Sequence, residues 1–473
     1  MSRNLRKKAV ARASRRASNN NNNNNTGPSL VSILAINNTP LSSLHNTDEE
    51  DLWSETSGDT IDSWASNSSK TNEDKAFEEA ISWEDEVLQS VDDLEEKRTS
   101  IREDALAKLI RLLSRKFSAY LLESRRQSLL DLLIRSIKKD KSYKENVLAA
   151  KVLALLFITF GEGHEEMYQE VVPILKYITI NTASPEVKSA CIKTLGLSCF
   201  IAGSKYEAID LLNFLSDIIR TSGASVNADD NAGPITSALN TYGLIFSELW
   251  SSSQKGGTQR AKEEFERVMP DHTKQLESAT MEVRVASGEN IALMFETLGI
   301  GRRIDSERWG NEDNSDEEGD TDYDGIEQLT HMLSTLATDS NRYRAKADRK
   351  IQRSVFRDVL RTVKDGDHIK EKLKFKNQTV YFTTWAKIIQ LRSFREILAE
   401  GLKAHFEENT LLQEIFEFVP PPPLEPLRNR PDSALSYNTA GSDTDTSVSK
   451  RKLKNNNKRA KVRKGNKRKG DIG

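Results

Sequence analysis

A short pattern that recurs four times limits the architectures open to this 473-residue chain. Each copy begins with a small residue, continues with Leu and ends on Phe: Ala154-Leu155-Leu156-Phe157, Gly196-Leu197-Ser198-Cys199-Phe200, Gly243-Leu244-Ile245-Phe246 and Ala292-Leu293-Met294-Phe295. Successive copies start 42, 47 and 49 residues apart, close to the roughly 40 to 47 residues of armadillo and HEAT units. A small residue lets neighbouring helices approach, while Leu and Phe fill the space between them. We therefore predict an all-α fold, an armadillo/HEAT-like α-solenoid. The alternative is chance recurrence of common residues.

Helical periodicity runs through the middle of the chain. Apolar residues recur three and four positions apart, as at Ile101, Ala105 and Leu109, which is the spacing of one helix face. Breakers such as Ser184-Pro185 and Gly203-Ser204 separate the helices. We predict an armadillo-like helical repeat domain over residues 73–300, an acidic linker over 301–325 and a C-terminal helical module over 326–420.

The two ends of the chain have a different composition. Residues 1–72 contain an Asn run and few apolar anchors, and residues 421–473 begin in prolines and end in Lys and Arg, so we predict a disordered N-terminal arm and a disordered basic tail. Residues 1–16 carry seven basic residues, residues 450–469 carry twelve, and neither segment has an acidic one. Because the whole chain has a net charge of −2, the rest carries −21. Such segregation favours nucleic acid or an acidic protein as the partner.

The C-terminal module is expected to be mainly helical. The periodicity predicts helices over Ile326–Ala337, Arg342–Val363, Trp385–Phe406 and Leu411–Phe418. Residues 373–383 alternate between apolar and polar side chains, as a short extended segment or hairpin does.

The second of these predicted helices sorts its charges by face. Five of its cations recur three and four residues apart and fall within one narrow arc, namely Lys346, Lys350, Arg353, Arg357 and Arg361. Asp348 and Asp358 lie off that arc. The cations are therefore expected to be free for an anionic partner. The predicted anion- or RNA-binding surface consists of Arg342, Arg344, Lys346, Lys350, Arg353, Arg357 and Arg361. The alternative is an ordinary solvated helix face.

The same stretch resembles a known family. Residues 336–361 read LATDSNRYRAKADRKIQRSVFRDVLR, and LKFKNQTVYFTTWAKIIQLRSFREILAEGL and LLQEIFEF follow. Together they resemble the C-terminal module of the interferon-related developmental regulator family, and weaker similarity through KTLGLSCFIAG and VASGENIALMFE extends the resemblance over about residues 75 to 420. The resemblance implies an armadillo-like, non-enzymatic protein. It also implies transcriptional co-regulation, and ribosome binding that represses translation.

Two segments carry candidates for regulation and transport. In the acidic run of the linker, Ser315 is followed by three acidic residues and resembles a substrate of an acid-directed kinase, and Thr321 is a second candidate. The alternative is an unmodified, solvated loop. The tail contains a candidate bipartite nuclear import signal made of Lys450, Arg451, Lys452, Lys458, Arg459 and Lys461.

The sequence has no signature of catalysis. It lacks GxxxxGK[ST], HExxH, GxSxG and paired CxxC motifs, and its six His residues are scattered singly. We expect no enzyme activity, no cofactor, no metal site and no small-molecule substrate. No apolar run approaches the roughly 20 residues of a membrane span, so we expect a soluble protein without a membrane partner. Cys191 and Cys199 are expected to be buried and reduced.

Two functions from different classes remain open. In the first, the protein docks on the ribosome through rRNA phosphates and represses translation. In the second, it is a nuclear co-regulator whose solenoid groove holds chromatin or transcription-regulatory proteins. We favour the ribosomal reading, because import explains a basic tail but not an ordered basic helix face. We expect the protein in both cytoplasm and nucleus.

Overall fold

The computed structural model describes residues 72–139, 141–250, 257–300, 323, 325–339, 345–375 and 378–420. The predicted N-terminal arm, most of the acidic linker and the basic tail lie outside these residues, so the domain boundaries stay a prediction.

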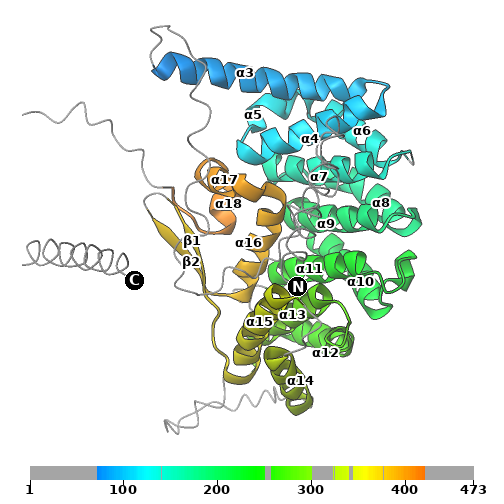
Figure 1. Ribbon diagram of the computed structural model, residues 1–473, viewed down its shortest axis with the longest axis vertical. Helices are drawn as coiled ribbons and strands as arrows, with labels where there is room; N and C mark the ends of the chain where they lie inside the picture. Colours follow the sequence, from blue (N-terminus) through cyan, green and yellow to red (C-terminus); the bar gives the residue numbers. More distant parts are fainter. Residues whose placement is uncertain are drawn as a thin grey trace, which may run out of the picture. The chain divides into compact units, whose positions relative to one another are not determined.

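Pairs of antiparallel helices stack along one direction (Figure 1). One row of helices is α4 (Thr99–Arg115), α7 (Tyr143–Phe160), α9 (Pro185–Ala202), α11 (Ala232–Leu249), α13 (Met281–Leu298) and α15 (Lys346–Asp365), each in contact with the next. The other row supplies one partner to each: α3 (Asn72–Asp92), α6 (Arg126–Ile137), α8 (Glu165–Asn181), α10 (Lys205–Arg220), α12 (Gly257–Gln275) and α14 (Ile326–Thr338). Short turns of helix lie between them at α5 (Ala119–Leu122), η2 (Asp93–Glu95), η3 (Glu123–Arg125) and η4 (Ala224–Val226). The predicted α-solenoid is confirmed.

The recurring pattern occupies the same position in four helices of the first row. The helices α7, α9, α11 and α13 begin at Tyr143, Pro185, Ala232 and Met281, so their starts differ by 42, 47 and 49 residues. The small residue that opens each copy is therefore the twelfth residue of its helix. The repeat is thus a structural repeat, in which each copy marks one helix of the first row.

The two glycines of the pattern lie where neighbouring helices leave no room for a Cβ atom. A Cβ added to Gly196 of α9 would lie 2.3 Å from Cγ2 of Thr241 on α11, and one added to Gly243 would lie 2.3 Å from Oδ1 of Asn290 on α13. Two residues before the small residue, in three of the four copies, a polar side chain binds the preceding helix of the row: Thr194 Oγ1 donates to Ala150 O at 2.9 Å, Thr241 Oγ1 to Ile192 O at 3.5 Å and Asn290 Nδ2 to Leu239 O at 2.8 Å. These bonds favour one register between neighbouring repeats, because they satisfy buried polar groups across the contact.

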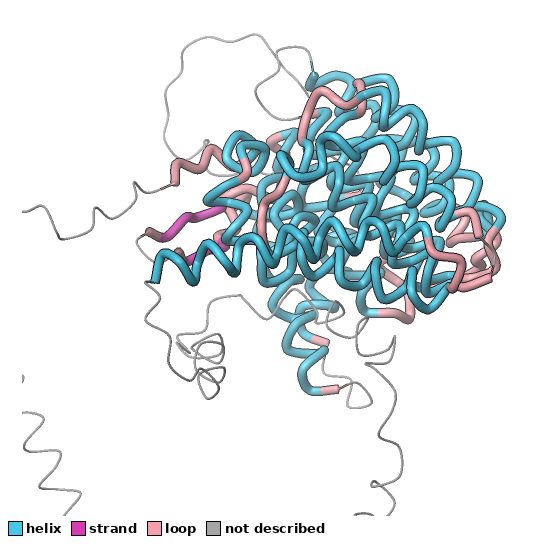
Figure 2. Tube along the Cα trace, turned by 90° about the horizontal axis from the view of Figure 1, so that it is seen from above, coloured by secondary structure: helices cyan, strands magenta, loops and turns pink. Residues whose placement is uncertain are grey.

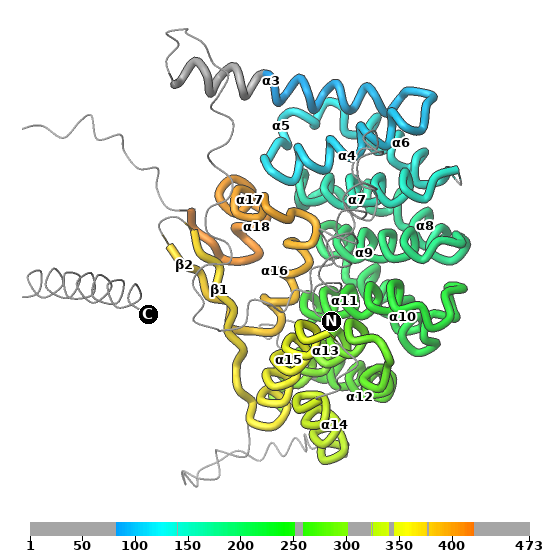
Figure 3. The backbone as a smooth tube through the Cα atoms, viewed as in Figure 1, coloured from blue at the N-terminus to red at the C-terminus, as the bar shows by residue number. Residues whose placement is uncertain are grey.

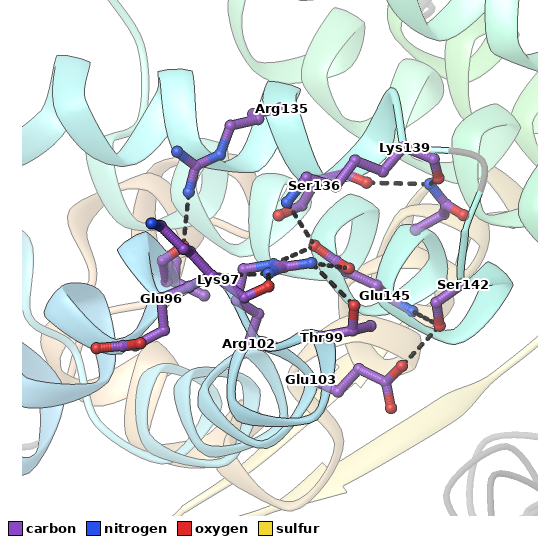
Figure 4. Close-up of polar contacts among 12 residues, drawn as sticks. Glu96, Lys97, Thr99, Arg102, Glu103, Arg135, Ser136, Lys139, Ser142 and Glu145 are labelled. Atoms are coloured by element: carbon purple, nitrogen blue, oxygen red, sulfur yellow. Dashed lines mark hydrogen bonds and ion pairs between the residues drawn. The ribbon is translucent and has the colours of Figure 1, made fainter.

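A second repeated device closes the turns between paired helices. The fourth residue of four first-row helices is a buried donor that binds backbone carbonyl oxygens at the end of the preceding helix or in the turn that follows it. These donors are Arg102, Asn146, Lys188 and Arg284. Figure 4 shows Arg102, whose guanidinium binds the carbonyl oxygens of Glu96 and Lys97 at 2.8 Å and the Glu145 carboxylate at 2.7 Å. Burial raises the pKa of Glu145, but the hydrogen bonds from Arg102 and Ser136, together with the positive charges of Arg102 and Lys139, hold that pKa below its usual range.

The chain after α15 turns back along the first row. We call residues 371–418 the return segment; it contains β1 (Glu371–Lys374), β2 (Thr379–Phe382), α16 (Trp385–Leu398), η7 (Ala399–Gly401), α17 (Leu402–Glu408) and α18 (Thr410–Ile415). The strands form the predicted hairpin, which is antiparallel. In Figure 3 the orange helices of this segment lie beside helices from the first half of the chain. Contacts of α16 with α7, α11 and α13, and of α17 with α4, bear this out.

The predicted helix over Trp385–Phe406 is wrong in one respect, because it breaks after Leu398. Ala399 adopts a positive φ of 47°, and the chain then continues through η7 into α17. A Cβ at Gly401 would lie 1.7 Å from the carbonyl oxygen of Ser114. The break therefore allows the backbone to pass directly against the end of α4, an approach that only glycine permits.

Candidate nucleic-acid interface

The helix α15 is fixed by its apolar face, which packs on α13. Val355, Phe356, Val359 and Val363 are buried, and the Phe356 ring lies against Gly288, where a Cβ would come within 2.7 Å of Cε1. Arg284 of α13 also donates to Gln352 Oε1 at 2.6 Å. These contacts determine which face of α15 is turned to solvent.

Four of the predicted cations lie on the exposed part of α15. Lys346, Lys350, Arg357 and Arg361 are exposed. We call Lys346, Lys350 and Arg357 the basic row; within the described residues no ion pair is recorded for these three side chains. Arg342 and Arg344 lie outside the described residues, as do Ser315, Thr321 and the import candidates.

The expectation that every cation is free is wrong for two residues. Arg353 is half-buried and its Nε donates to the carbonyl oxygen of Asp339 at 2.9 Å, so it caps the turn after α14. Arg361 Nη1 lies 3.7 Å from Oδ1 of Asp358, a carboxylate that helical periodicity placed off the basic arc. A separation of three residues brings a long Arg side chain within reach of such a carboxylate. Arg353 therefore has a structural role, and Arg361 is partly neutralised.

A set of charges that sequence reasoning missed lies between α16 and the first row. The ninth residues of α7, α9 and α13 are Lys151, Lys193 and Glu289. Lys193 pairs with Glu396 of α16, and Glu289 pairs with Arg392 of the same helix. Burial lowers the pKa of Lys151 to about 8, an effect that the nearby Glu396 carboxylate opposes and the Lys193 ammonium strengthens. The equivalent position in each repeat was the available signal, but the opposite charges are far away in the sequence.

These pairs fix the direction and register of α16. Glu396 meets the lysines of the earlier repeats and Arg392 meets the carboxylate of a later one, so a reversed helix would oppose like charges. Arg395 Nη1 also donates to Glu371 of β1 at 2.7 Å, which ties α16 to the hairpin. This part of the solenoid face is therefore occupied by the chain's own helix.

The two cysteines behave as predicted. Both Cys191 and Cys199 are free and buried. Burial raises the pKa of the Cys191 thiol to about 12 and that of Cys199 to about 11. Their thiolates are therefore scarce at neutral pH, which makes the residues unreactive.

The described part of the chain offers no grouping for metal chemistry. Among its residues, no three His, Cys, Asp or Glu side chains gather in a way that could hold a metal ion. None of its helices has the length and apolarity that crossing a membrane requires.

Comparison with known proteins gives a consistent result. Residues 53–364 match the family model of the interferon-related developmental regulators. The chain is 33% identical over 345 residues to interferon-related developmental regulator 2 of Mus musculus, covering 71% of this chain and 73% of that protein. It is 32% identical over 334 residues to interferon-related developmental regulator 1 of Homo sapiens, covering 69% of each.

Among solved structures, a designed armadillo repeat protein is similar with a TM-score of 0.32 and 16% identity, over 57% of this chain and 98% of that chain.

Proposed function

The chain belongs to the interferon-related developmental regulator family, and from this membership we propose that it binds the ribosome through rRNA phosphates and represses translation. Its family and its α-solenoid fold are those of a regulatory protein rather than an enzyme. The proposal places the protein chiefly in the cytoplasm, with nuclear entry through the basic tail.

The observation that supports this proposal is the basic row on α15. Lys346, Lys350 and Arg357 are exposed cations on a helix whose other face is held by buried contacts, so they present charge at fixed spacing. Each phosphate that they neutralise releases condensed counterions, which makes such binding tight at low salt and weak at high salt. Phosphate contacts of this kind position a protein without reading sequence.

A sedimentation experiment tests the proposal. The protein is expected to comigrate with ribosomes or with one subunit at low salt and to dissociate as salt rises. Reversing Lys346, Lys350 and Arg357 to Glu should abolish comigration and leave the melting temperature nearly unchanged, because exposed side chains contribute little to stability. Arg353 is left intact in this variant, since its loss would remove a bond to the backbone.

A charge-matched control separates a docking surface from general electrostatics. Three exposed cations far from α15 in the sequence are Lys108 on α4 and Lys138 and Lys141 in the turn between α6 and α7. Their reversal changes the net charge equally. This control should still comigrate. Equal loss in both variants would contradict a role for the basic row. Wild-type protein that stays in the light fractions at low salt, yet accumulates in nuclei through residues 450–469, would favour a nuclear co-regulator bound to chromatin or transcription-regulatory proteins.

A further inference from the structure

The hairpin of β1 and β2 separates its side chains into two chemically different faces. Its register pairs Glu371 with Phe382 and Leu373 with Val380, and these four side chains are buried or pack partly buried against the core. Because side chains alternate along a strand, the remaining ones point the other way. All four residues of this outer face are exposed: Lys372, Lys374, Thr379 and Tyr381. In Figure 2 the two strands lie at the margin of the helical body.

The outer face is cationic without a compensating acid on the strands. The sequences EKLK and TVYF contain one carboxylate, Glu371, and it is buried on the inner face. Glu371 accepts a hydrogen bond from Arg395 and lies 3.9 Å from Nε of Arg392. The acid is thus neutralised inside the protein, and the ammonium groups of Lys372 and Lys374 remain outside. No ion pair of these two lysines is recorded within the part of the chain that the structure describes.

An unpacked aromatic ring lies on the same face as these charges. Tyr381 is opposite Lys372 in the hairpin register and is 64% exposed. Among the described residues, no ring contact or hydrogen bond of its side chain is recorded. Tyr120 is equally exposed, at 63%, but its hydroxyl donates to Glu84. An open ring beside one lysine and diagonal to a second is a combination that can bind a base and its neighbouring phosphates.

We propose that this outer hairpin face binds unpaired RNA, with a base stacked on Tyr381 and adjacent phosphates on Lys372 and Lys374. The two lysines are two residues apart on a strand, about 7 Å, so their flexible side chains reach successive phosphates of one strand. A duplex keeps its bases paired and stacked, so the ring favours a single strand. The inference deepens the proposed function, because it names unpaired RNA as the feature that a second surface recognises, separate from α15.

Binding of the full chain to a labelled single-stranded RNA of about 12 nucleotides, and to the same sequence in a duplex, tests the inference. Fluorescence anisotropy at several salt concentrations gives Kd and its salt dependence. Tyr381→Ala should weaken single-strand binding about tenfold, leave duplex binding unchanged and keep the salt slope, whereas Tyr381→Phe should bind as the wild type does. Lys372→Glu combined with Lys374→Glu should weaken binding to both RNAs and flatten the salt dependence.

Matched controls decide between this reading and a merely solvated hairpin. Tyr206 is 87% exposed on α10, and Tyr206→Ala should bind single-stranded RNA normally. The inference is overturned if Tyr381→Ala binds as the wild type does, if Tyr206→Ala weakens binding equally, or if polyglutamate competes as well as RNA, which would indicate an acidic protein partner. The assay contains no ribosomes, so single-strand binding that depends on Tyr381 supports the inference even where ribosome comigration fails.

Discussion

At the scale of single residues, the most specific contacts are those where two helices of the first row touch through a glycine. We predict that Gly196→Ala destabilises the protein by roughly 1 to 3 kcal/mol, although Ala favours helix more than Gly does. The added Cβ would meet Cγ2 of Thr241 at 2.3 Å, and a β-branched side chain has few rotamers with which to move away. Chemical denaturation measures the loss. The control is Gly233→Ala in the first turn of α11, where the added Cβ would lie 3.1 Å from Oγ of Ser189. This variant should be nearly neutral.

A buried histidine makes stability depend on pH. Burial lowers the pKa of His272 from 6.5 to about 4. Its Nδ1 lies 3.1 Å from Val268 O, and its Nε2 lies 3.3 Å from the Asn290 amide nitrogen, a donor that a protonated ring could not accept from. Below pH 6.5 the unfolded chain binds the proton and the folded one does not, so stability is full above that pH and declines toward pH 4. We predict a loss of about 2 kcal/mol between pH 7 and pH 5 from this residue.

Urea midpoints at the two pH values measure this loss. His272→Gln should show a smaller difference between pH 7 and pH 5, whatever its stability at pH 7. His331→Gln, at an exposed position of α14, should leave the difference unchanged. A pH dependence that survives intact in His272→Gln would refute the assignment.

At the scale of helices and strands, the charges on α16 act as its positioning device. We predict that Glu396→Lys destabilises the protein by roughly 1 to 2 kcal/mol, since it gathers three ammonium groups where Lys151 and Lys193 already lie near Glu396. Adding Lys193→Glu to that variant should restore most of the loss, because the pair is then reversed rather than broken. Thermal melting of the two single variants and the double variant measures the coupling. Additive losses would show that the pair does not position α16.

Sequence patterns predicted the positions of the helices better than the contacts between residues that are distant in the sequence. The repeated small residue predicted the first row because it is a local signal with a fixed period, and the alternation at residues 373–383 predicted the hairpin. The break at Ala399 was missed because its cause, the backbone of Ser114, is distant in the sequence. The hydrogen bond from Arg353 to Asp339 O was also missed. Helical periodicity places a side chain on one face of its helix but does not identify the residues of other segments that contact that face. Whether the basic row binds RNA stays a prediction.

At the scale of the whole molecule, the return segment changes how a solenoid should unfold. Repeats in an open solenoid contact only their neighbours, so separate parts can unfold independently. Here Trp385 N donates to Glu296 of α13, Asn409 Nδ2 donates to Ile158 O of α7, and the His405 ring binds Leu113 O of α4. One segment thus links early and late repeats, and we expect them to unfold in a single cooperative transition.

Removal of the return segment is the corresponding prediction. A chain ending at Gly366 should melt at a lower temperature, because it exposes the apolar residues that α16 and α17 cover and leaves Glu289 and Lys193 without their partners. Its early and late repeats should also no longer unfold in the same transition. A chain ending at Pro420 keeps every contact described above and should melt as the full chain does. Hydrogen exchange of α4 and α13 amides, followed through the transition, measures the coupling directly: equal opening free energies are expected with the return segment and unequal ones without it. If α4 and α13 open independently in the full chain, the return segment does not couple the repeats, and its ion pairs serve only to hold α16 in place.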